Sequence, residues 1–479
     1  MTPELVPFVP ASSPSPTTVW LTDRSRYKLG TSRCPRARFL GYYWGPTGYG
    51  LTLRADSLPL ATGLYVHQGV EAFGRLMLRT DRLPSLQETR DIVAAICQAY
   101  LQRVEVRGFR GVLAGEHTEE TIVEQSVLIS GLLWALRLKV LPWLHETYRL
   151  VSVEEERTHL LACTCGAGPL DLAEHTARGC QGVAIMLRND LLAARRTGTT
   201  LAYFEVKTTG WESEAWAEQW EADPQLGLGT IDAQARYGAE VAEIYVVGLN
   251  KGRRARDWKD TEGRKKQQSA LAYGYFRPGN PPLAPDDWKP AYEWVDEAGE
   301  VKRAPRTHKR TGVWELAKSD WPAWVAHKAE DDALTPEECW VRLLPPSVLD
   351  KVCFVLGPMN RQDAQIASLR RSMAGEEARW RETLWRLYDA GQQHGWASET
   401  YQATLDAEVP CSWACRPFGR EHQCEFFQLC HREAGWEDPL AGGRYVPRRP
   451  HHQIELETAV ARGLLPPEAA EREAEDEER

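Results

Sequence analysis

The sequence predicts an α/β protein, and three features of its middle third indicate this class. The first strand of a sheet is expected at 150–156, where Glu154 and Glu156 share a face and could reach a site, with solvated charge as the alternative. Residues 187–207 indicate a hairpin with a tight turn at Thr197–Thr199. A helix at 224–237 and a further apolar strand at 241–249 follow. Because strands and helix follow one another along this part of the chain, they are expected to form one sheet covered by helices.

The elements before the sheet are expected to be helical. Val70, Phe73 and Met77 recur at helical spacing, which predicts a helix over this stretch. Two further helices are expected at 86–104 and 118–141. The second begins with an acidic first turn, as helix N-termini do, and is apolar enough to lie in a core.

Length and composition bound the class of protein. The chain has 479 residues, of which 43% are hydrophobic, so it is long enough for two or more domains with a sizeable core. The N-terminus lacks the basic start and apolar run of a secretion signal, and no apolar run approaches the roughly 20 residues of a membrane span. A cytoplasmic protein without membrane contact is therefore expected, and its 11 cysteines indicate metal sites before disulfides.

Changes in composition along the chain predict its parts. The predicted parts are a flexible arm at 1–20, a helical N-terminal part at 21–149, the sheet core at 150–250, a basic and aromatic insertion with a charged helix (360–394) at 251–400, a cysteine clasp at 401–445, and an acidic, disordered tail at 446–479.

Two charged residues in the apolar strand 201–207 carry the main functional signal. Side chains alternate between the faces of a strand, so Glu205 and Lys207 lie on one face and Val206 on the other. Burying a carboxylate and an ammonium group is costly, and a metal site would explain their position. Together with Asp190 across the turn, Glu205 could hold Mg²⁺ or Mn²⁺ while Lys207 orients a water molecule. The alternative is a structural ion pair on a half-exposed strand.

The order of acid, hairpin and acid-x-Lys in Asp190, Glu205 and Lys207 resembles the core of PD-(D/E)XK nucleases. Asn189 stands where that family usually has a proline. The resemblance implies a restriction-endonuclease-like core, in which a central mixed sheet is flanked by helices and these three residues are catalytic.

Two further elements resemble the RecB-like branch of that family. His67, four residues after Gly63, matches its Gly-x-x-x-His element, which implies an additional ligand to Mg²⁺ or Mn²⁺. A histidine without a site role is the alternative. Gln225 matches the first residue of the Gln-x-x-x-Tyr element, although Gly229 replaces the tyrosine. This match implies that Gln225 supports the lysine or the scissile strand, and Gln234 is a rival candidate with poorer spacing.

A short segment between two predicted strands holds four soft candidate ligands. Cys163, Cys165, His175 and Cys180 have spacing typical of a closed Cys3His zinc site. Such a site would be structural, because it leaves no open coordination position. Free cysteines in a loop are the alternative.

A second cysteine-rich segment lies in the clasp, and four cysteines so close together in a cytosolic chain indicate metal. The segment resembles the iron–sulfur subset of RecB-like nucleases, which includes the AddB helicase–nuclease subunit and CRISPR-associated and phage relatives. The resemblance implies a 4Fe-4S cluster held by Cys34, Cys415, Cys424 and Cys430, with Cys411 as a spare or a substitute for Cys415. Zinc bound by the local cysteines alone is the alternative.

The net charge of −9 is unusual for a nucleic-acid-binding protein, but the charge is unevenly distributed. Lys251, Arg253, Arg254 and Arg256 form a basic loop directly after the last strand of the core. Local basic patches, rather than the total charge, decide phosphate binding, so DNA contact is expected here. A merely solvated loop is the alternative. The aromatic residues of 270–345 suit base stacking as well as they suit an ordinary β-rich insertion.

The resemblance covers about residues 26–250 and 405–435. It implies a metal-dependent deoxyribonuclease that acts at linear DNA ends in recombination, repair or phage DNA processing, with a helicase or recombinase as a partner. A catalytically silent nucleic-acid-binding module of the same fold and a zinc-only nuclease without a cluster are the alternatives.

Overall fold

A computed structural model describes most of the chain. The described residues are 19–44, 48–53, 58–107, 119–163, 182–210, 214–238, 241–251, short strands between 253 and 315, and most of 349–466. Most of the predicted arm, the loop of the zinc segment and the end of the acidic tail lie outside these residues. Val19 and Trp20, which the sequence places in the arm, begin a strand instead, and residues 453–461 of the tail expected to be disordered form a helix whose Leu456 is buried.

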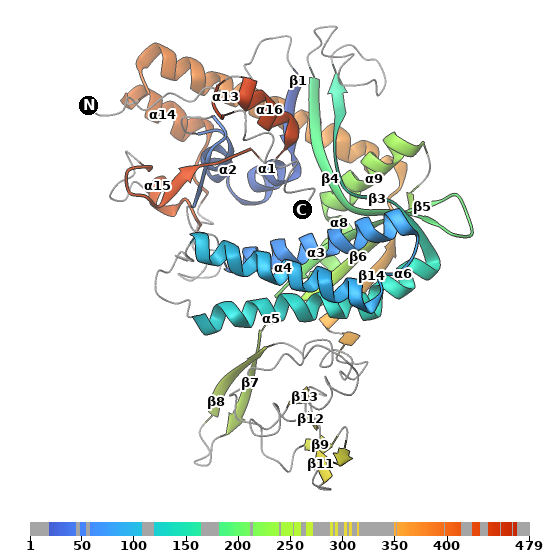
Figure 1. Ribbon diagram of the computed structural model, residues 1–479. Helices are drawn as coiled ribbons and strands as arrows, with labels where there is room; N and C mark the ends of the chain where they lie inside the picture. Colours follow the sequence, from blue (N-terminus) through green and yellow to red (C-terminus); the bar gives the residue numbers. More distant parts are fainter. Residues whose placement is uncertain are drawn as a thin grey trace.

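A mixed six-stranded sheet forms the centre of the molecule (Figure 1). The pairs β1–β4 and β5–β6 are parallel, whereas β3–β4, β4–β5 and β6–β14 are antiparallel. The α/β class predicted from the sequence is confirmed. The six strands are β1 (Val19–Asp23), β3 (Tyr148–Cys163), β4 (Gly182–Arg195), β5 (Leu201–Thr209), β6 (Val241–Asn250) and β14 (Cys353–Met359).

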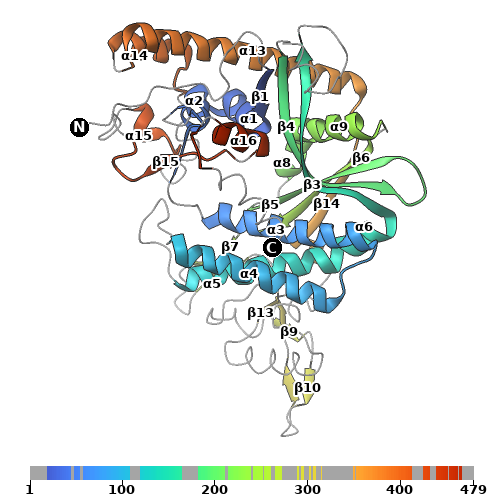
Figure 2. The same ribbon diagram turned by 45° about the horizontal axis from the view of Figure 1, so that its top comes forward.

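One face of the sheet is covered by the predicted N-terminal helices (Figure 2). Helix α3 lies against β3 and β5, and α4 and α5 pack on α3. Buried side chains such as Phe73, Leu132 and Phe204 form the core between them. The helices are α3 (Leu58–Thr80), α4 (Leu86–Arg107), α5 (Glu119–Ala135), η2 (Leu136–Val140) and α6 (Leu141–Thr147).

The stretch Gln125–Thr147 is long and apolar enough to cross a membrane, contrary to the expectation that no run approaches that length. However, 67% of its most apolar window is buried inside the fold. Leu128, Leu132 and Trp134 belong to the same core as the sheet. The stretch thus packs as the core helix of a soluble protein does.

The opposite face carries α8 (Glu214–Ala222), α9 (Pro224–Tyr237) and α13 (Asp363–His394), of which α9 contacts β4, β5 and β6. Asp223 caps α9 by accepting a hydrogen bond from the Gln225 N–H, and Pro224 occupies the first turn, where no donor is lost. Gly238 ends the helix with φ 58°, a left-handed conformation that glycine adopts without strain. Helix α13 confirms the charged helix predicted at 360–394.

Segments from the two ends of the sequence pack together beside the sheet (Figure 2). Strand β15 pairs with β2, and the buried Arg26 forms an ion pair with Glu455 of α16. The elements involved are α1 (Arg24–Lys28), η1 (Leu29–Arg33), α2 (Pro35–Tyr42), β2 (Leu51–Leu53), α14 (Glu399–Glu408), α15 (Phe427–Cys430), β15 (Tyr445–Pro447) and α16 (Gln453–Ala461).

The predicted insertion contributes several short strands outside the central sheet. Strands β7 and β8 form a hairpin, and β9, β12 and β13 form a small antiparallel sheet. The strands are β7 (Arg253–Lys259), β8 (Lys265–Leu271), β9 (Trp288–Pro290), β10 (Glu293–Val295), β11 (Val301–Arg303), β12 (Arg306–His308) and β13 (Trp314–Glu315). The same predicted part also contributes β14 to the edge of the central sheet.

Candidate metal centre

Strand β4 has two different neighbours along one edge, and the candidate site lies where they part. Strand β1 pairs with residues 182–186 of β4, and β5 pairs with residues 191–194. Strand β3 runs along the other edge of both halves, so β1 and β5 share one edge. Residues 187–190 lie between the two paired stretches, where the edge of β4 is open. Asp190 Oδ2 accepts a hydrogen bond from the Val206 N–H at 2.5 Å, so a side chain continues the pairing where the two backbones separate.

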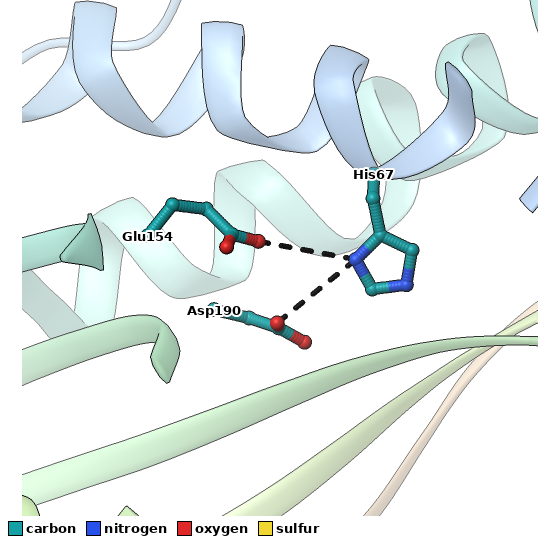
Figure 3. Close-up of side chains that lie close together, drawn as sticks. All are labelled: His67, Glu154 and Asp190. Carbon is teal, nitrogen blue, oxygen red and sulfur yellow. Dashed lines mark ion pairs between the residues drawn. The ribbon is translucent and has the colours of Figure 1, made fainter. Parts of the chain in front are cut away.

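Three side chains from three elements converge at this opening, as Figure 3 shows. His67 comes from α3, Glu154 from β3 and Asp190 from β4, and one ligand atom of each lies within 4.8 Å of the others. His67 Nδ1 is 3.9 Å from both Glu154 Oε1 and Asp190 Oδ1. One imidazole nitrogen and two carboxylate oxygens suit a divalent cation such as Mn²⁺ or Mg²⁺. The structure thus brings together the predicted His67 and Asp190 and adds Glu154.

The backbone of Glu154 is in the left-handed region, with φ 47° in the middle of a strand. Its neighbours keep the ladder, since Val153 pairs with Leu191 and Glu155 with Asn189, so Glu154 lies directly across from Asp190. A left-handed conformation costs a residue with a side chain roughly 1–2 kcal/mol. Strain of this kind gathers at functional sites, where surrounding contacts hold it in place. The surrounding structure thus holds Glu154 in an unfavourable backbone conformation, in which its carboxylate lies beside His67.

Opposing charges shift the pKa values within this group. Burial disfavours the charged form of His67, but the carboxylates of Asp190 and Glu154 outweigh burial and raise the pKa of His67. Burial raises the pKa of Asp190, and the nearby Lys207 acts in the opposite direction. Both shifts reflect a site in which negative charge is concentrated away from water. A bound cation would relieve that excess of negative charge.

The predicted pair Glu205 and Lys207 lies beside this group rather than within it. Glu205 is fully buried, and its carboxylate accepts hydrogen bonds from the Tyr203 hydroxyl, the Gln225 side-chain amide and the Lys207 ammonium group. Burial raises the pKa of Glu205, and the negative charge of Asp190 raises it further. The carboxylate is therefore close enough to Asp190 to sense its charge, but it is held by its own three donors.

The predicted Gln225 does lie at the site, whereas the rival Gln234 lies two turns further along α9. Gln225 is buried, and its Oε1 atom has no hydrogen-bond partner among the described residues. It lines a cavity of about 170 Å³ between β4, α9 and the start of α1. Other residues lining this cavity are Arg24, Glu156, Arg188, Asn189, Tyr203, Gly229 and His452.

Lys251, the first residue of the predicted basic loop, lies close to the same group. A Cβ atom placed on Gly63 would be 3.4 Å from Lys251 Nζ and 2.9 Å from Thr208 Oγ1. Gly63 precedes His67 by one turn of α3, so the missing side chain lets the lysine approach the helix surface next to the histidine. Burial lowers the pKa of Lys251 to about 8. The side chains of Arg253, Arg254 and Arg256 lie outside the described part of the structure.

Thiols from both ends of the chain meet in the clasp. Cys34 Sγ accepts a hydrogen bond from the Ser412 N–H at 3.3 Å. Burial raises the pKa of the Cys430 thiol, and its neighbours Cys411, Cys424 and Cys34 raise it further. Cys34 thus joins C-terminal cysteines as the sequence predicts, and Cys411 is among them. Cys415 lies outside the described residues.

The predicted zinc segment falls mostly outside the structure described here. Cys163 ends β3, where it pairs with Gly182, and it is half-buried. Cys165, His175 and Cys180 lie in residues 164–181, outside the described part of the chain. A zinc site there stays a prediction.

Tyr203 went unassigned in the sequence analysis, and Glu154 was expected only to be able to reach a site, without a role. Glu154 is the first of three consecutive glutamates in a strand, which resembles an ordinary solvated acidic run. Tyr203 precedes Glu205 by two residues and hence shares its face, but tyrosine is common in strands for packing alone. Neither position could be distinguished without the contacts that α3 and α9 make with the sheet.

Comparison with known proteins adds no relative to these observations. No protein-family model matches the chain, and a search of curated proteins finds no match. Function is therefore inferred from the motifs and from the geometry of the side chains.

Proposed function

We propose that this protein is a metal-dependent deoxyribonuclease with a RecB-like PD-(D/E)XK core. The observation that carries the proposal is the convergence of His67, Glu154 and Asp190 beside Glu205 and Lys207. The mixed sheet with helices on both faces is compatible with such a core. A structural ion pair alone would account for Glu205 and Lys207, but it would not account for a histidine and two more carboxylates at the same opening.

The chemistry of the donor set fits Mg²⁺ or Mn²⁺, because the carboxylates are hard ligands and the imidazole suits Mn²⁺. His67, Glu154 and Asp190 would hold the ion, with Glu205 next to them. The ion would supply charge stabilisation at the phosphodiester and make a water molecule easier to deprotonate.

The chain's own groups would complete the site. Lys207, whose side chain is 22% exposed, would direct its ammonium group toward the water and the developing negative charge. Gln225 would hold the Glu205 carboxylate. Lys251 would bind a DNA phosphate, because it directly follows β6 and its Nζ lies against α3 one turn from His67.

We propose that the clasp holds a 4Fe-4S cluster through four thiolates. Cys34, Cys411, Cys424 and Cys430 fit such a group, because the first three lie near enough to Cys430 to raise the pKa of its thiol, and the segments that carry them pack together. The cluster would tie residues near 34 to residues 411–430. Anaerobically purified protein is then expected to be brown, with visible absorbance, whereas a zinc-only clasp would be colourless.

The proposal is tested with a nuclease assay on anaerobically purified protein. Linear and circular DNA, single- and double-stranded, are compared with Mg²⁺ and with Mn²⁺. The variants are Lys207→Ala and, as a matched control, Lys28→Ala, whose side chain is 47% exposed and pairs with Asp223 rather than with any proposed metal ligand. We expect degradation of linear DNA by the wild type and Lys28→Ala, and a loss of at least about 100-fold in Lys207→Ala.

Resistance of circular DNA would establish that the enzyme acts at ends, and equal cleavage would make it an endonuclease. If the wild type and Lys207→Ala are equally inert but bind DNA with equal affinity, the nuclease proposal is wrong. The protein would then be a nucleic-acid-binding module of the same fold.

A further inference from the structure

Glu205 receives a hydrogen bond that the sequence motifs do not assign. The Tyr203 hydroxyl donates to Glu205 Oε2, while the Gln225 amide and the Lys207 ammonium group both contact Oε1. Tyr203 is therefore a donor to the Oε2 side of the carboxylate. Tyr203 and Glu205 are two residues apart on β5, and thus share one face of the strand.

Helix α9 leaves room for this tyrosine. A Cβ atom on Gly229 would be 2.4 Å from Tyr203 Cε1 and 2.5 Å from Cζ, closer than carbon atoms can approach. Gly229 lies one turn after Gln225 on the same side of α9, so the helix presents Gln225 to the carboxylate and an empty surface to the tyrosine ring. The ring of Tyr203 packs against α9 at Gly229, and the residue is only 1% exposed.

We propose that Tyr203 is a positioning residue that fixes the orientation of Glu205 from within the strand, in place of a side chain from α9. The inference rests on the proposed nuclease function. Packing alone would require only the ring, and phenylalanine would satisfy it. A phenol buried to this extent must pair its hydroxyl, and here the partner is the carboxylate of the site.

The space shared by Tyr203 and Gly229 allows a direct test by exchange. Tyr203→Phe removes the hydroxyl and keeps the ring. Tyr203→Ala/Gly229→Tyr moves a phenol from the strand to the helix, into the space that the ring vacates. Tyr203→Ala/Gly229→Phe restores the ring at the same place without the hydroxyl, and is the matched control. Melting temperature and circular dichroism of each variant are measured alongside activity.

We expect Tyr203→Phe to lower kcat about tenfold or more, since a hydrogen bond to a charged group is lost, with the KM for DNA unchanged. The exchange variant with tyrosine at 229 is expected to recover activity relative to the one with phenylalanine, at similar stability. A purely structural role would not distinguish these two variants. Equal kcat of Tyr203→Phe and wild type would overturn the proposal.

Calorimetric Mn²⁺ binding separates this inference from the nuclease proposal. It requires no turnover, and Tyr203→Phe is expected to bind Mn²⁺ about tenfold more weakly than the wild type. If the wild type binds Mn²⁺ but cleaves no DNA, the proposed function fails while the role of Tyr203 is still decided by the two affinities. Equal affinities in that case would refute the positioning role.

Discussion

The strained backbone at Glu154 predicts that glycine at this position stabilises the fold relative to alanine while both destroy the metal site. Glu154→Gly and Glu154→Ala lose the same carboxylate and the same 2.9 Å contact with Arg188, so those losses cancel in their difference. At φ 47°, alanine keeps the cost of the left-handed region, roughly 1–2 kcal/mol, and glycine does not. Against this, glycine loses roughly 0.5–1 kcal/mol of chain entropy. The net expectation is a free energy of unfolding about 0.5–1 kcal/mol higher for glycine.

Position 155 supplies the matched control. Glu155 pairs with Asn189 in the ladder, and its side chain is 43% exposed. Here glycine gains nothing, so Glu155→Gly is expected to be less stable than Glu155→Ala by roughly 0.5–1 kcal/mol. The glycine variant is thus expected to be the more stable one at position 154, and the alanine variant at position 155.

Urea unfolding followed by tryptophan fluorescence measures these differences as shifts in the midpoint at constant slope. Calorimetry with Mn²⁺ measures the site, and both variants at 154 are expected to bind at least about tenfold more weakly than the wild type. If glycine is less stable than alanine at 154 by the same amount as at 155, the strand carries no strain there. Unchanged Mn²⁺ affinity in both variants would remove Glu154 from the metal centre.

Three further predictions concern other parts of the molecule. Burial alone would lower the pKa of His452, but Asp23 and Glu156 outweigh burial and raise the pKa to about 9. The charged histidine then stabilises the fold by up to about 3 kcal/mol, fully below pH 6.5, and this stabilisation is lost as pH rises through 9. Urea midpoints should therefore fall between pH 6.5 and 9 in the wild type and not in His452→Gln. Lys251→Ala should weaken DNA binding and reduce the slope of log K for DNA binding against log salt concentration by about 1. The DNA affinity of the wild type should also fall as pH rises through 8. An unchanged slope in the variant would refute a phosphate contact. Cys411→Ser should abolish the visible absorbance of anaerobically purified protein. Cys97, whose thiol lies between α4 and α5, supplies the control, and Cys97→Ser should keep the absorbance. Full absorbance in both variants would exclude Cys411 as a ligand.

Local sequence patterns predicted the parts of the fold that depend on local forces. The apolar alternation of β5 predicts which residues face which side, and the structure has Phe204 and Val206 in the core under α3 with Tyr203 on the side of α9. Helix α13 ends at His394, directly before Gly395, as predicted. Strands β1 and β14 were missed, because each is short and its place in the sheet depends on partners far away in the sequence.

Some residues of the candidate site could likewise be predicted from local sequence, and others could not. Asp190 and His67 were predicted from spacing and resemblance, and they meet because β4 and α3 are both long, regular elements. Glu154 was expected to be able to reach the site but was not assigned as a ligand, because its position depends on a left-handed backbone that no local pattern encodes. Cys411 and Cys415 could not be ranked by spacing, since the choice depends on how residues 411–430 fold against Cys34.

The pairing of the first and last segments has a consequence for synthesis on the ribosome. Strand β2 pairs with β15, Arg26 pairs with Glu455, and Cys34 contacts Ser412. The N-terminal segment around α1 and α2 therefore cannot complete its packing until residues beyond 450 have left the ribosome. Synthesis at roughly 5–20 residues per second leaves that segment waiting for tens of seconds, with apolar side chains such as Phe39 exposed. These side chains are buried in the finished protein, so this part of the core forms only when translation is almost complete.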